Sequence, residues 1–394
     1  MSKRVMFVFG TRPEAIKIAP IIRMAKRNPE LEVCVCSTGQ HREMLASVLS
    51  VFEIVPDFDF GLMKPGQTLK DITVAVLDKL TEIIHHKKPD WIVVQGDTTT
   101  AMAASLCGFY ERIRVAHVEA GLRTSDRFSP FPEEFNRRVT ALIADLHFAP
   151  TDVAAKNLLK EALHPKSVFV TGNTGIDALL LVVEKLESDV ALRSSYDERF
   201  AFLDSARKMI LVTVHRRESF GEPLRQVFQA LKTLSLRSDV QLVIPLHPNP
   251  NVRAAAQEIL GDSAQWWTDG QSMDNAPIVL LEPQQYFEFV YLMRESYFII
   301  SDSGGIQEEA PTLGKPVLVV RENTERPEAI EAGSCKLVGT NPDVICREAN
   351  RLLDDDQIYA KMSRAVSPYG DGTASQKILA HMIDFGVASG RETL

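Results

Sequence analysis

The residues that could do chemistry stand just after short apolar runs of the sequence. The run 297–300 is followed by SDSGGIQEEAPTLGKP, Ser301 to Pro316, which places two glycines beside a serine and two adjacent glutamates further on. Amides at a helix start, a hydroxyl and glycines that allow close backbone approach together suit a diphosphate. A carboxylate one turn later, from Glu308 or Glu309, can accept hydrogen bonds from both hydroxyls of a ribose. The segment predicts a nucleotide site, although SGG also suits an ordinary turn before a helix.

A second candidate anion site follows the first apolar run, 5–9. The segment GTRPEAIK supplies Gly10 for a turn, Arg12 in the loop and Lys17 about one helical turn later. Positive side chains and free amides at the start of a helix favour an anion. The spacing is not a GxGxxG fingerprint, and a solvated arginine and lysine are an equal alternative for this motif alone.

Carboxylates follow the other apolar runs of the first half. Asp97 comes after WIVVQG, Glu119 after RVAHV, and Glu133 with Glu134 after the loop GLRTSDRFSPFP. Each acid alone is more typical of a helix N-cap or a surface group, and Asp97 before three threonines is a good cap candidate. Carboxylates that meet in one place raise each other's pKa, as acid/base chemistry near neutral pH requires.

Two histidines occupy matching places in the second half. His215 ends the run MILVTV in VHRRESFG, and His247 follows the next run in VIPLHPNP. A lone histidine is more often structural. One that precedes two arginines at a strand end indicates phosphate binding or proton transfer.

These turns need a scaffold that brings them together, and the sequence shows a regular one. Short β-branched runs alternate with helical patterns, first in RVMFVF, EVCVCS, WIVVQ and RVAHVE, then in MILVTV, QLVIPL, IVLLE, YFIIS and PVLVV. Such alternation is typical of βα repeats that build a parallel sheet. We therefore predict an α/β fold of two doubly wound domains. Residues after each run are expected to converge, because ligands bind at the carboxyl ends of parallel strands.

The boundary between the two domains is expected near Thr171 to Thr174. There TGNTGIDALL and the polar ESDVALRSSYDERF read as a connector. The first domain is predicted to span 1–172 and the second 173–371. A glycine-rich turn, SPYGDG, then precedes a terminal helix, 372–394, which is expected to pack back on the first domain.

Composition excludes several classes of function. The 394 residues include 52 acidic and 44 basic side chains, for a net charge of −8, with no block of lysine or arginine, so we expect no nucleic-acid partner. The apolar run Val5 to Phe9 is too short for a signal peptide or a membrane span, which predicts a cytoplasmic protein without a membrane partner. Five cysteines without a CxxC pair suit reduced thiols, and no metal site is expected.

Ten motifs, spread in order from Phe9 to Gly372, carry a family resemblance. They are FGTRPEAIK, GQHREML, GDTTT, HVEAGLRT, PFPEEFNRR, TGNTGIDALL, VHRRESFG, SDSGGIQEEAPTLGKPVLV, ERPEA and PYGDG. Together the sequence resembles the non-hydrolysing UDP-N-acetylglucosamine 2-epimerases. The resemblance implies two Rossmann-like domains facing across a cleft in a glycosyltransferase-B-like fold. It also implies a homodimer that interconverts UDP-GlcNAc and UDP-ManNAc for polysaccharide precursors, without a cofactor.

The resemblance further implies roles for individual residues. The catalytic positions are Asp97, Glu119, Glu133 and His215. The UDP-binding positions are Arg12, Lys17, Phe289, Ser303, Gly304, Gly305 and Glu309, with Arg326 on the sugar side. Some members bind a second UDP-GlcNAc as an activator, for which the matching positions are Gln40, Glu134, Arg216 and His247. This chain departs from those members at Glu43, where they carry glutamine, and at Gly66, where they carry arginine, which weakens the expectation of activation.

The implied chemistry explains the number of acids. The C2 proton of UDP-GlcNAc is not beside a carbonyl, so its removal is feasible only as UDP leaves C1, by anti elimination to a 2-acetamidoglucal. Readdition of UDP with protonation on the other face of C2 gives the manno sugar, which requires acid/base groups on both faces. The alternatives are a glycosyltransferase of the same fold, a hydrolysing epimerase that releases ManNAc, and a non-catalytic sugar-nucleotide sensor.

Overall fold

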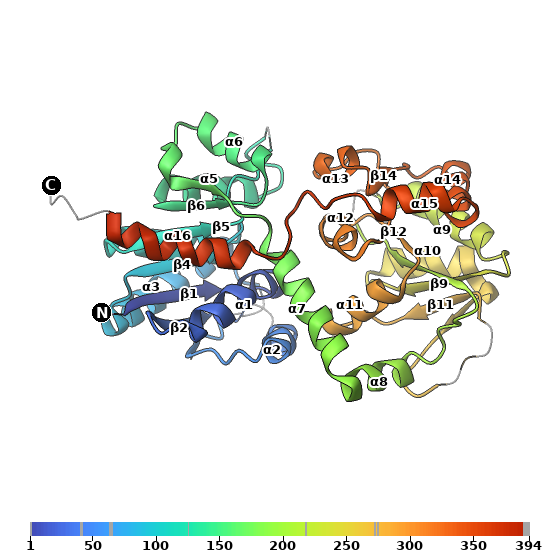
Figure 1. Ribbon diagram of the computed structural model, residues 1–394, viewed down its shortest axis with the longest axis horizontal. Helices are drawn as coiled ribbons and strands as arrows, with labels where there is room; N and C mark the ends of the chain where they lie inside the picture. Colours follow the sequence, from blue (N-terminus) through green and yellow to red (C-terminus); the bar gives the residue numbers. More distant parts are fainter. Residues whose placement is uncertain are drawn as a thin grey trace. The chain divides into compact units, whose positions relative to one another are not determined.

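The computed structural model describes residues 2–388, apart from 40–41, 63–65, 125, 217–218, 272 and 274–275. The chain divides into two compact units (Figure 1). Unit 1 comprises Met1–Leu181 and Tyr369–Leu394, and unit 2 comprises Val182–Pro368. Each unit contains a parallel seven-stranded sheet with flanking helices. The prediction of a doubly wound α/β fold is confirmed for both halves of the chain.

The sheet of unit 1 has the strand order β3-β2-β1-β4-β5-β6-β7. Its strands are β1 (Lys3–Phe9), β2 (Leu31–Ser37), β3 (Phe58–Asp59), β4 (Trp91–Gln95), β5 (Arg114–Val118), β6 (Leu146–Ala149) and β7 (Val168–Val170). The chain winds outward from β1 in one direction and from β4 in the other. The β1–β4 boundary is therefore the switch point at which loops diverge and a ligand site is expected.

Threonines begin four of the helices around this sheet. Thr11, Thr68, Thr98 and Thr151 are the N-caps of α1, α3, α4 and α6, and each hydroxyl accepts an amide of the first turn. The helical segments of unit 1 are α1 (Arg12–Arg27), α2 (Arg42–Val51), α3 (Leu69–Lys87), α4 (Thr99–Tyr110), α5 (Glu133–Ile143), α6 (Asp152–Lys160), η1 (Pro165–Ser167), the first part of α7 (Thr174–Ser188) and α16 (Ala374–Ala388). An N-cap determines the residue at which a helix begins. The caps therefore define where the turn between each strand and the following helix ends, and these turns carry the polar residues.

The sheet of unit 2 has the strand order β10-β11-β9-β8-β12-β13-β14. Its strands are β8 (Lys208–Thr213), β9 (Val240–Pro245), β10 (Ala264–Trp266), β11 (Ile278–Leu281), β12 (Phe298–Ser301), β13 (Val317–Val319) and β14 (Cys335–Leu337). Its helical segments are α8 (Val190–Arg199), α9 (Glu222–Leu234), α10 (Pro250–Leu260), η3 (Gly261–Ser263), α11 (Tyr286–Glu295), α12 (Gly304–Glu309), η4 (Ala310–Leu313), α13 (Pro327–Glu331), α14 (Pro342–Asp354) and α15 (Asp356–Ser363). The switch point lies between β8 and β12, whose following turns hold His215 and Ser303.

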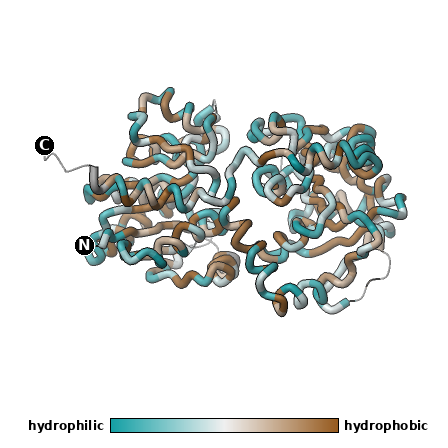
Figure 2. The backbone as a smooth tube through the Cα atoms, viewed as in Figure 1, coloured by the Kyte–Doolittle hydropathy of each residue, from teal (hydrophilic) through white to brown (hydrophobic). Residues whose placement is uncertain are grey.

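Both cores consist of apolar strands covered by helices. In unit 1, Met6, Val8 and Ile92 of the sheet pack with residues of α3 and α4. In unit 2, Ile210 and Phe298 belong to a larger cluster that includes α9, α10 and α14. Figure 2 shows the hydrophobic segments along the strands of each sheet. Strands buried on both faces need continuous apolar runs, which explains why the runs in the sequence do not alternate with polar residues.

The C-terminal helix α16, drawn in red in Figure 1, packs on unit 1 beside α1. The ring of Phe385 meets Trp91 edge-on at a centroid distance of 5.7 Å. The start of α16 is held by Asp177, whose Oδ1 accepts the Ser375 amide at 2.7 Å. Within the described residues, no helix is long and apolar enough to cross a membrane.

The units divide inside α7, between Leu181 and Val182, and again before Tyr369. The sequence placed the first division earlier, at 172/173, because it took the glycine-containing TGNTG as a connector. The first turns of α7 instead contribute buried Ile176 and Leu179 to unit 1. A continuous helix crosses the boundary, so no break in the sequence pattern marks it.

Gly121, which follows β5, packs directly against the backbone of α6. A Cβ on Gly121 would lie 2.2 Å from Ala154 O, and its φ is +91°. We expect Gly121→Ala to lower the free energy of unfolding by about 2 to 5 kcal/mol, through backbone strain and overpacking. Gly61→Ala is the matched control, because Gly61 also has a positive φ, +55°, but open space around it, and about 1 kcal/mol is expected there. Urea titrations followed by circular dichroism test this, and equal losses in the two variants would contradict the close packing.

Candidate active site

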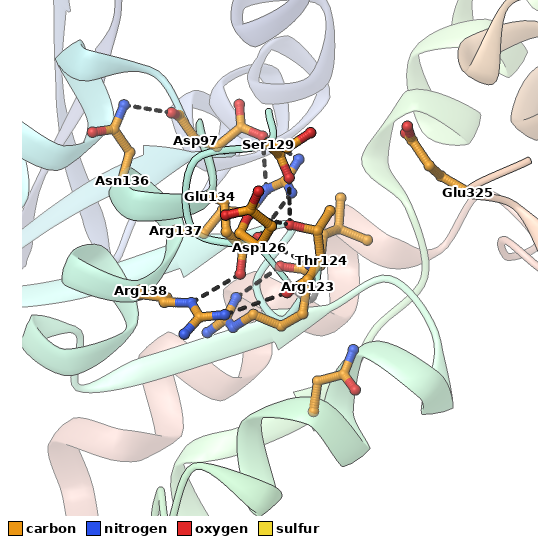
Figure 3. A network of polar contacts seen from close by, with 12 residues as sticks. Asp97, Arg123, Thr124, Asp126, Ser129, Glu134, Asn136, Arg137, Arg138 and Glu325 are labelled. Atoms are coloured by element: carbon orange, nitrogen blue, oxygen red, sulfur yellow. Dashed lines mark hydrogen bonds and ion pairs between the residues drawn. The ribbon is translucent and has the colours of Figure 1, made fainter. Parts of the chain in front are cut away.

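The side chains of α5 hold Asp97, which follows β4 (Figure 3). Asp97 Oδ2 accepts hydrogen bonds from Arg137 Nη2 at 2.7 Å and from Arg137 Nε at 2.9 Å. Asn136 Nδ2 donates to the Asp97 carbonyl at 2.9 Å. The N-cap of α4 is Thr98, not Asp97. The cap alternative for this acid is therefore wrong, and its carboxylate is fixed at the sheet edge by a guanidinium.

Glu119, which follows β5, receives a donor at each carboxylate oxygen. Lys17 Nζ of α1 contacts Oε1 and Gln95 Nε2 of β4 contacts Oε2. The backbone of Glu119 has a φ of 62°, a left-handed conformation that is uncommon for residues other than glycine. The turn thus aims the carboxylate back across the carboxyl edge of the sheet. Two predicted residues, Glu119 and Lys17, are brought together here.

The adjacent acids at the start of α5 have different environments. Glu134 is fully buried, with its carboxylate bonded to Thr124 N at 3.0 Å, Arg138 Nε at 2.9 Å and Arg137 Nη1 at 3.3 Å. Figure 3 shows Glu134 among these partners. Glu133 is half-buried, and its Oε2 is buried without a hydrogen-bond partner in the described part of the chain. Glu134 therefore supports the preceding loop, whereas one oxygen of Glu133 is not engaged by such partners.

Two buried histidines lie behind these turns, on neighbouring strands. His117 of β5 pairs in register with His147 of β6, and His117 Nε2 bonds to the Gly96 carbonyl at 2.7 Å. Burial lowers the pKa of His117 to about 3 and that of His147 to about 4. A neutral imidazole therefore holds the turn that carries Asp97.

In unit 2, Asp302 joins the turns after β12 and β8. Its Oδ2 accepts the amides of His215 and Arg216, both at 2.8 Å, and its Oδ1 lies 3.4 Å from His215 Nδ1. The rings of His215 and His247 stack with centroids 5.5 Å apart. Burial, followed by the neighbouring His215, lowers the pKa of His247. The buried carboxylate thus fixes the backbone of His215 and lies near its ring.

Two guanidinium groups flank the glycine turn after β12. A Cβ on Gly304 would lie 3.6 Å from Arg216 Nη2 and 3.7 Å from Arg326 Nη2. Arg326 Nε bonds to the buried Glu308. The face of Gly304 therefore opens toward two positive charges, beside Ser303. This arrangement suits a phosphate group.

The remaining predicted residues have less defined surroundings. Arg12 at the start of α1, Phe289 on α11 and Glu309 at the end of α12 are half-buried, and Gly305 is exposed. Gly66 is exposed with a φ of 76°. Gln40 lies outside the described residues, as does the side chain of Glu43. In the described ranges, no group of three or more His, Cys, Asp or Glu side chains is placed to hold a metal ion.

Four residues that the sequence did not single out support the site. They are Glu14, Gln95, Arg137 and Asp302. The TRPE pattern, with Thr11 and Glu14 three residues apart before an apolar run, is the signature of a capping box. Gln95 is the polar residue that ends the run WIVVQ, and Arg137 follows Glu133 by one helical turn. No sequence pattern links Asp302 to its partners 87 and 86 residues away.

The two sheets, with acids at the carboxyl edge of one and a glycine turn between guanidiniums at that of the other, define a Rossmann-like, glycosyltransferase-B-like enzyme. Residues 23–383 match the family described as UDP-N-acetylglucosamine 2-epimerase. The chain is 50% identical over 377 residues to the UDP-N-acetylglucosamine 2-epimerase of Escherichia coli K12, which covers 95% of this chain and 97% of that protein. The chain belongs to the UDP-N-acetylglucosamine 2-epimerase family, and it is an isomerase.

Solved structures agree over almost the whole chain. The crystal structure of the Neisseria meningitidis UDP-GlcNAc 2-epimerase bound to UDP-GlcNAc has a TM-score of 0.86 and 46% identity, and covers 97% of this chain and 100% of that one. The Methanocaldococcus jannaschii enzyme in complex with UDP-GlcNAc and UDP has a TM-score of 0.75 and 30% identity, with the same coverage. The family resemblance and the predicted fold class are thus confirmed.

The buried histidines make unit 1 sensitive to acid. In the unfolded chain His147 becomes protonated below about pH 6.5. In the folded unit the same imidazole stays neutral down to about pH 4. The free energy of unfolding should therefore decrease as the pH is lowered through this window, by about 1.4 kcal/mol per pH unit for such a group. His147→Gln should reduce the slope by this amount in urea titrations at pH 5, 6 and 7. Parallel pH profiles of parent and variant would show that His147 is not held neutral.

Proposed function

We propose that the chain epimerises UDP-GlcNAc to UDP-ManNAc through elimination and readdition of UDP. The observation that carries the proposal is that Asp97 and Glu119 follow the neighbouring strands β4 and β5 and Glu133 begins the next helix, in a chain that matches the epimerase family along nearly its full length. A sugar-nucleotide sensor has no use for three such acids. A glycosyltransferase needs only one base.

The reaction balances with carboxylates alone. One carboxylate removes the C2 proton as the C1–O bond breaks and its electron pair leaves with UDP, which gives the 2-acetamidoglucal. A protonated carboxyl group then delivers a proton to the opposite face of C2 while UDP re-forms the bond to C1. Positioned acids and bases of this kind accelerate proton transfer about 100- to 10,000-fold.

The acid/base groups are assigned to unit 1. Arg137 fixes Asp97, and Lys17 with Gln95 fixes Glu119. Glu133 supplies a carboxylate oxygen that has no partner in the described residues. His215, held by Asp302, is assigned to catalysis from unit 2. We do not assign either face of C2 to a particular carboxylate.

The diphosphate groups are assigned to the turn after β12 in unit 2. Ser303, Gly304 and Gly305 supply a hydroxyl and an accessible backbone, and Arg216 and Arg326 flank them. Arg12 and Lys17 are the cations assigned from unit 1, with Phe289 for the uracil and Glu309 for the ribose. An activator contact through Glu134 is not part of the proposal, because that carboxylate is fully buried and bonded.

We also propose that the protein forms a homodimer and is located in the cytoplasm. Phe109 and Tyr110 on α4 and Leu142 on α5 are 63%, 65% and 82% exposed. Large apolar side chains on neighbouring helices are suited to a second copy of the chain. The molar mass in solution tests this, and a monomer at micromolar concentration would contradict it.

The activity is tested by incubating the protein with UDP-GlcNAc in D2O and following both sugars by NMR. UDP-ManNAc should form with deuterium at C2, and the remaining UDP-GlcNAc should acquire deuterium there too. Asp97→Asn, Glu119→Gln and Glu133→Gln should each lower kcat by roughly a hundredfold or more, with UDP binding retained. Glu111→Gln, a change of an acid that pairs with His85, is the control. Free ManNAc as product would indicate the hydrolysing reaction, and parent rates in all three variants would remove these acids from the mechanism.

The diphosphate assignment is tested at Gly304. The methyl of Gly304→Ala meets only ordinary contacts, at 3.6 Å or more, so the fold should keep its Tm. It fills the space between Arg216 and Arg326, and UDP affinity should fall about tenfold or more, or about 1.4 kcal/mol. Gly305→Ala, whose Cβ lies 3.9 Å from Ser303 Oγ, should have a smaller effect. Calorimetric titration with UDP measures both, and unchanged affinity for Gly304→Ala would place the phosphates elsewhere.

A further inference from the structure

A buried carboxylate that the mechanism does not use lies beneath the two turns of the unit 1 switch point. Glu14 of α1 is 1% exposed and accepts four hydrogen bonds. Three come from the turn after β1: Gly10 N at 3.0 Å, Thr11 N at 2.7 Å and Thr11 Oγ1 at 2.8 Å, all to Oε2. The fourth comes from the turn after β4, where Thr98 Oγ1 donates to Oε1 at 2.6 Å.

The directions of these bonds follow for an ionised Glu14, which can only accept. The two amides can only donate. Each threonine hydroxyl already accepts an amide of its own helix, Thr11 Oγ1 from Glu14 N at 3.4 Å and Thr98 Oγ1 from Ala101 N at 3.0 Å. An ionised Glu14 has no hydrogen to donate, so each hydroxyl hydrogen is the one that contacts its carboxylate. Burial raises the pKa of Glu14, and the four hydrogen bonds oppose that rise. A carboxylate accepts all four bonds, whereas an amide in its place presents an NH2 group to one side.

Each turn held by Glu14 carries a residue of the proposed site. Thr11 immediately precedes Arg12, and Thr98 immediately follows Asp97. The turns also pack tightly, since a Cβ on Gly10 would lie 2.7 Å from Thr100 Oγ1. The amides of Gly10 and Thr11 are used by Glu14. These two amides are therefore not free to bind an anion at this turn, which leaves the side chains of Arg12 and Lys17 as the candidate anion contacts.

We propose that Glu14 is a positioning residue for the epimerisation, which ties the turn of Arg12 to the turn of Asp97 and fixes their separation. The proposal rests on the proposed function of Asp97 and Arg12. Supporting groups of this kind typically contribute 10- to 100-fold to activity when they orient a reacting group. A displacement of about 1 Å at the reacting atoms has a similar effect.

The chain offers a close control for Glu14. Asp71 forms the same capping box with Thr68 at the start of α3, with bonds from Thr68 N at 2.9 Å and Thr68 Oγ1 at 2.8 Å. Asp71 does not bond to a second turn among the described contacts, and it is exposed. Glu14→Gln should lower kcat for UDP-GlcNAc by tenfold or more, with a smaller change in KM. Asp71→Asn loses a comparable cap and should keep the parent kcat.

Substitutions of Thr98 test the same hydrogen bond between Thr98 and Glu14 from the donor side. Thr98→Val removes the bond to Glu14 together with the N-cap of α4, and kcat should again fall by tenfold or more. Thr98→Ser keeps the hydroxyl and should restore the parent rate. Thr151→Val removes another buried N-cap, that of α6, and is the control for lost stability. The Glu14→Gln, Thr98→Val double variant should lose less than the product of the two single losses, because both changes affect the same bond between Thr98 and Glu14.

Steady-state kinetics below the Tm of each variant decide the matter. Rates for Glu14→Gln and Thr98→Val within twofold of the parent, or equal losses in Asp71→Asn and Thr151→Val, overturn the positioning role. Effects that multiply in the double variant overturn it as well. If Glu14→Gln does not fold, the Thr98 pair gives the same decision. If Glu14→Gln and Thr98→Val keep the parent rate while Asp97→Asn is inactive, only the positioning role is refuted. If the parent protein itself is inactive, the proposed function is refuted.

Discussion

A buried carboxylate needs donors, and in this protein the donors are the backbone amides of the turns that carry the site. Glu14 takes the amides of Gly10 and Thr11, Glu134 takes that of Thr124, and Asp302 takes those of His215 and Arg216. Removing such an acid would leave buried amides unsatisfied, at about 1 to 3 kcal/mol each. The turns of the candidate site are thus held from beneath by acids that are not among the residues proposed to react.

The sequence predicted the scaffold well because parallel sheets impose a simple pattern. Strands covered on both faces must be continuously apolar, and the residue after each strand must lie at the same sheet edge. Asp97, Glu119 and Ser303 could therefore be placed at strand ends without coordinates. The family motifs then implied roles that spacing alone left open, and for Asp97 the structure excludes the cap alternative.

The rest depends on contacts between residues far apart in the chain. Glu133 and Glu134 are adjacent and chemically alike, and only the packing of α5 decides which one is enclosed by arginines. The partners of Asp97 and Asp302 come from 40 and 87 residues away. The division inside α7 was missed for a related reason, since a continuous helix carries no breaker where it passes from one unit to the next.

The position of α16 has a consequence for biosynthesis. Unit 2 is a single stretch of chain, so all of its strands and helices exist once residue 368 has been made. Unit 1 begins at the first residue but includes α16, whose Phe385 covers Trp91 of the central strand β4. Until α16 leaves the ribosome, the part of unit 1 made before it keeps that apolar face uncovered, although every strand and helix of unit 2 has by then been made.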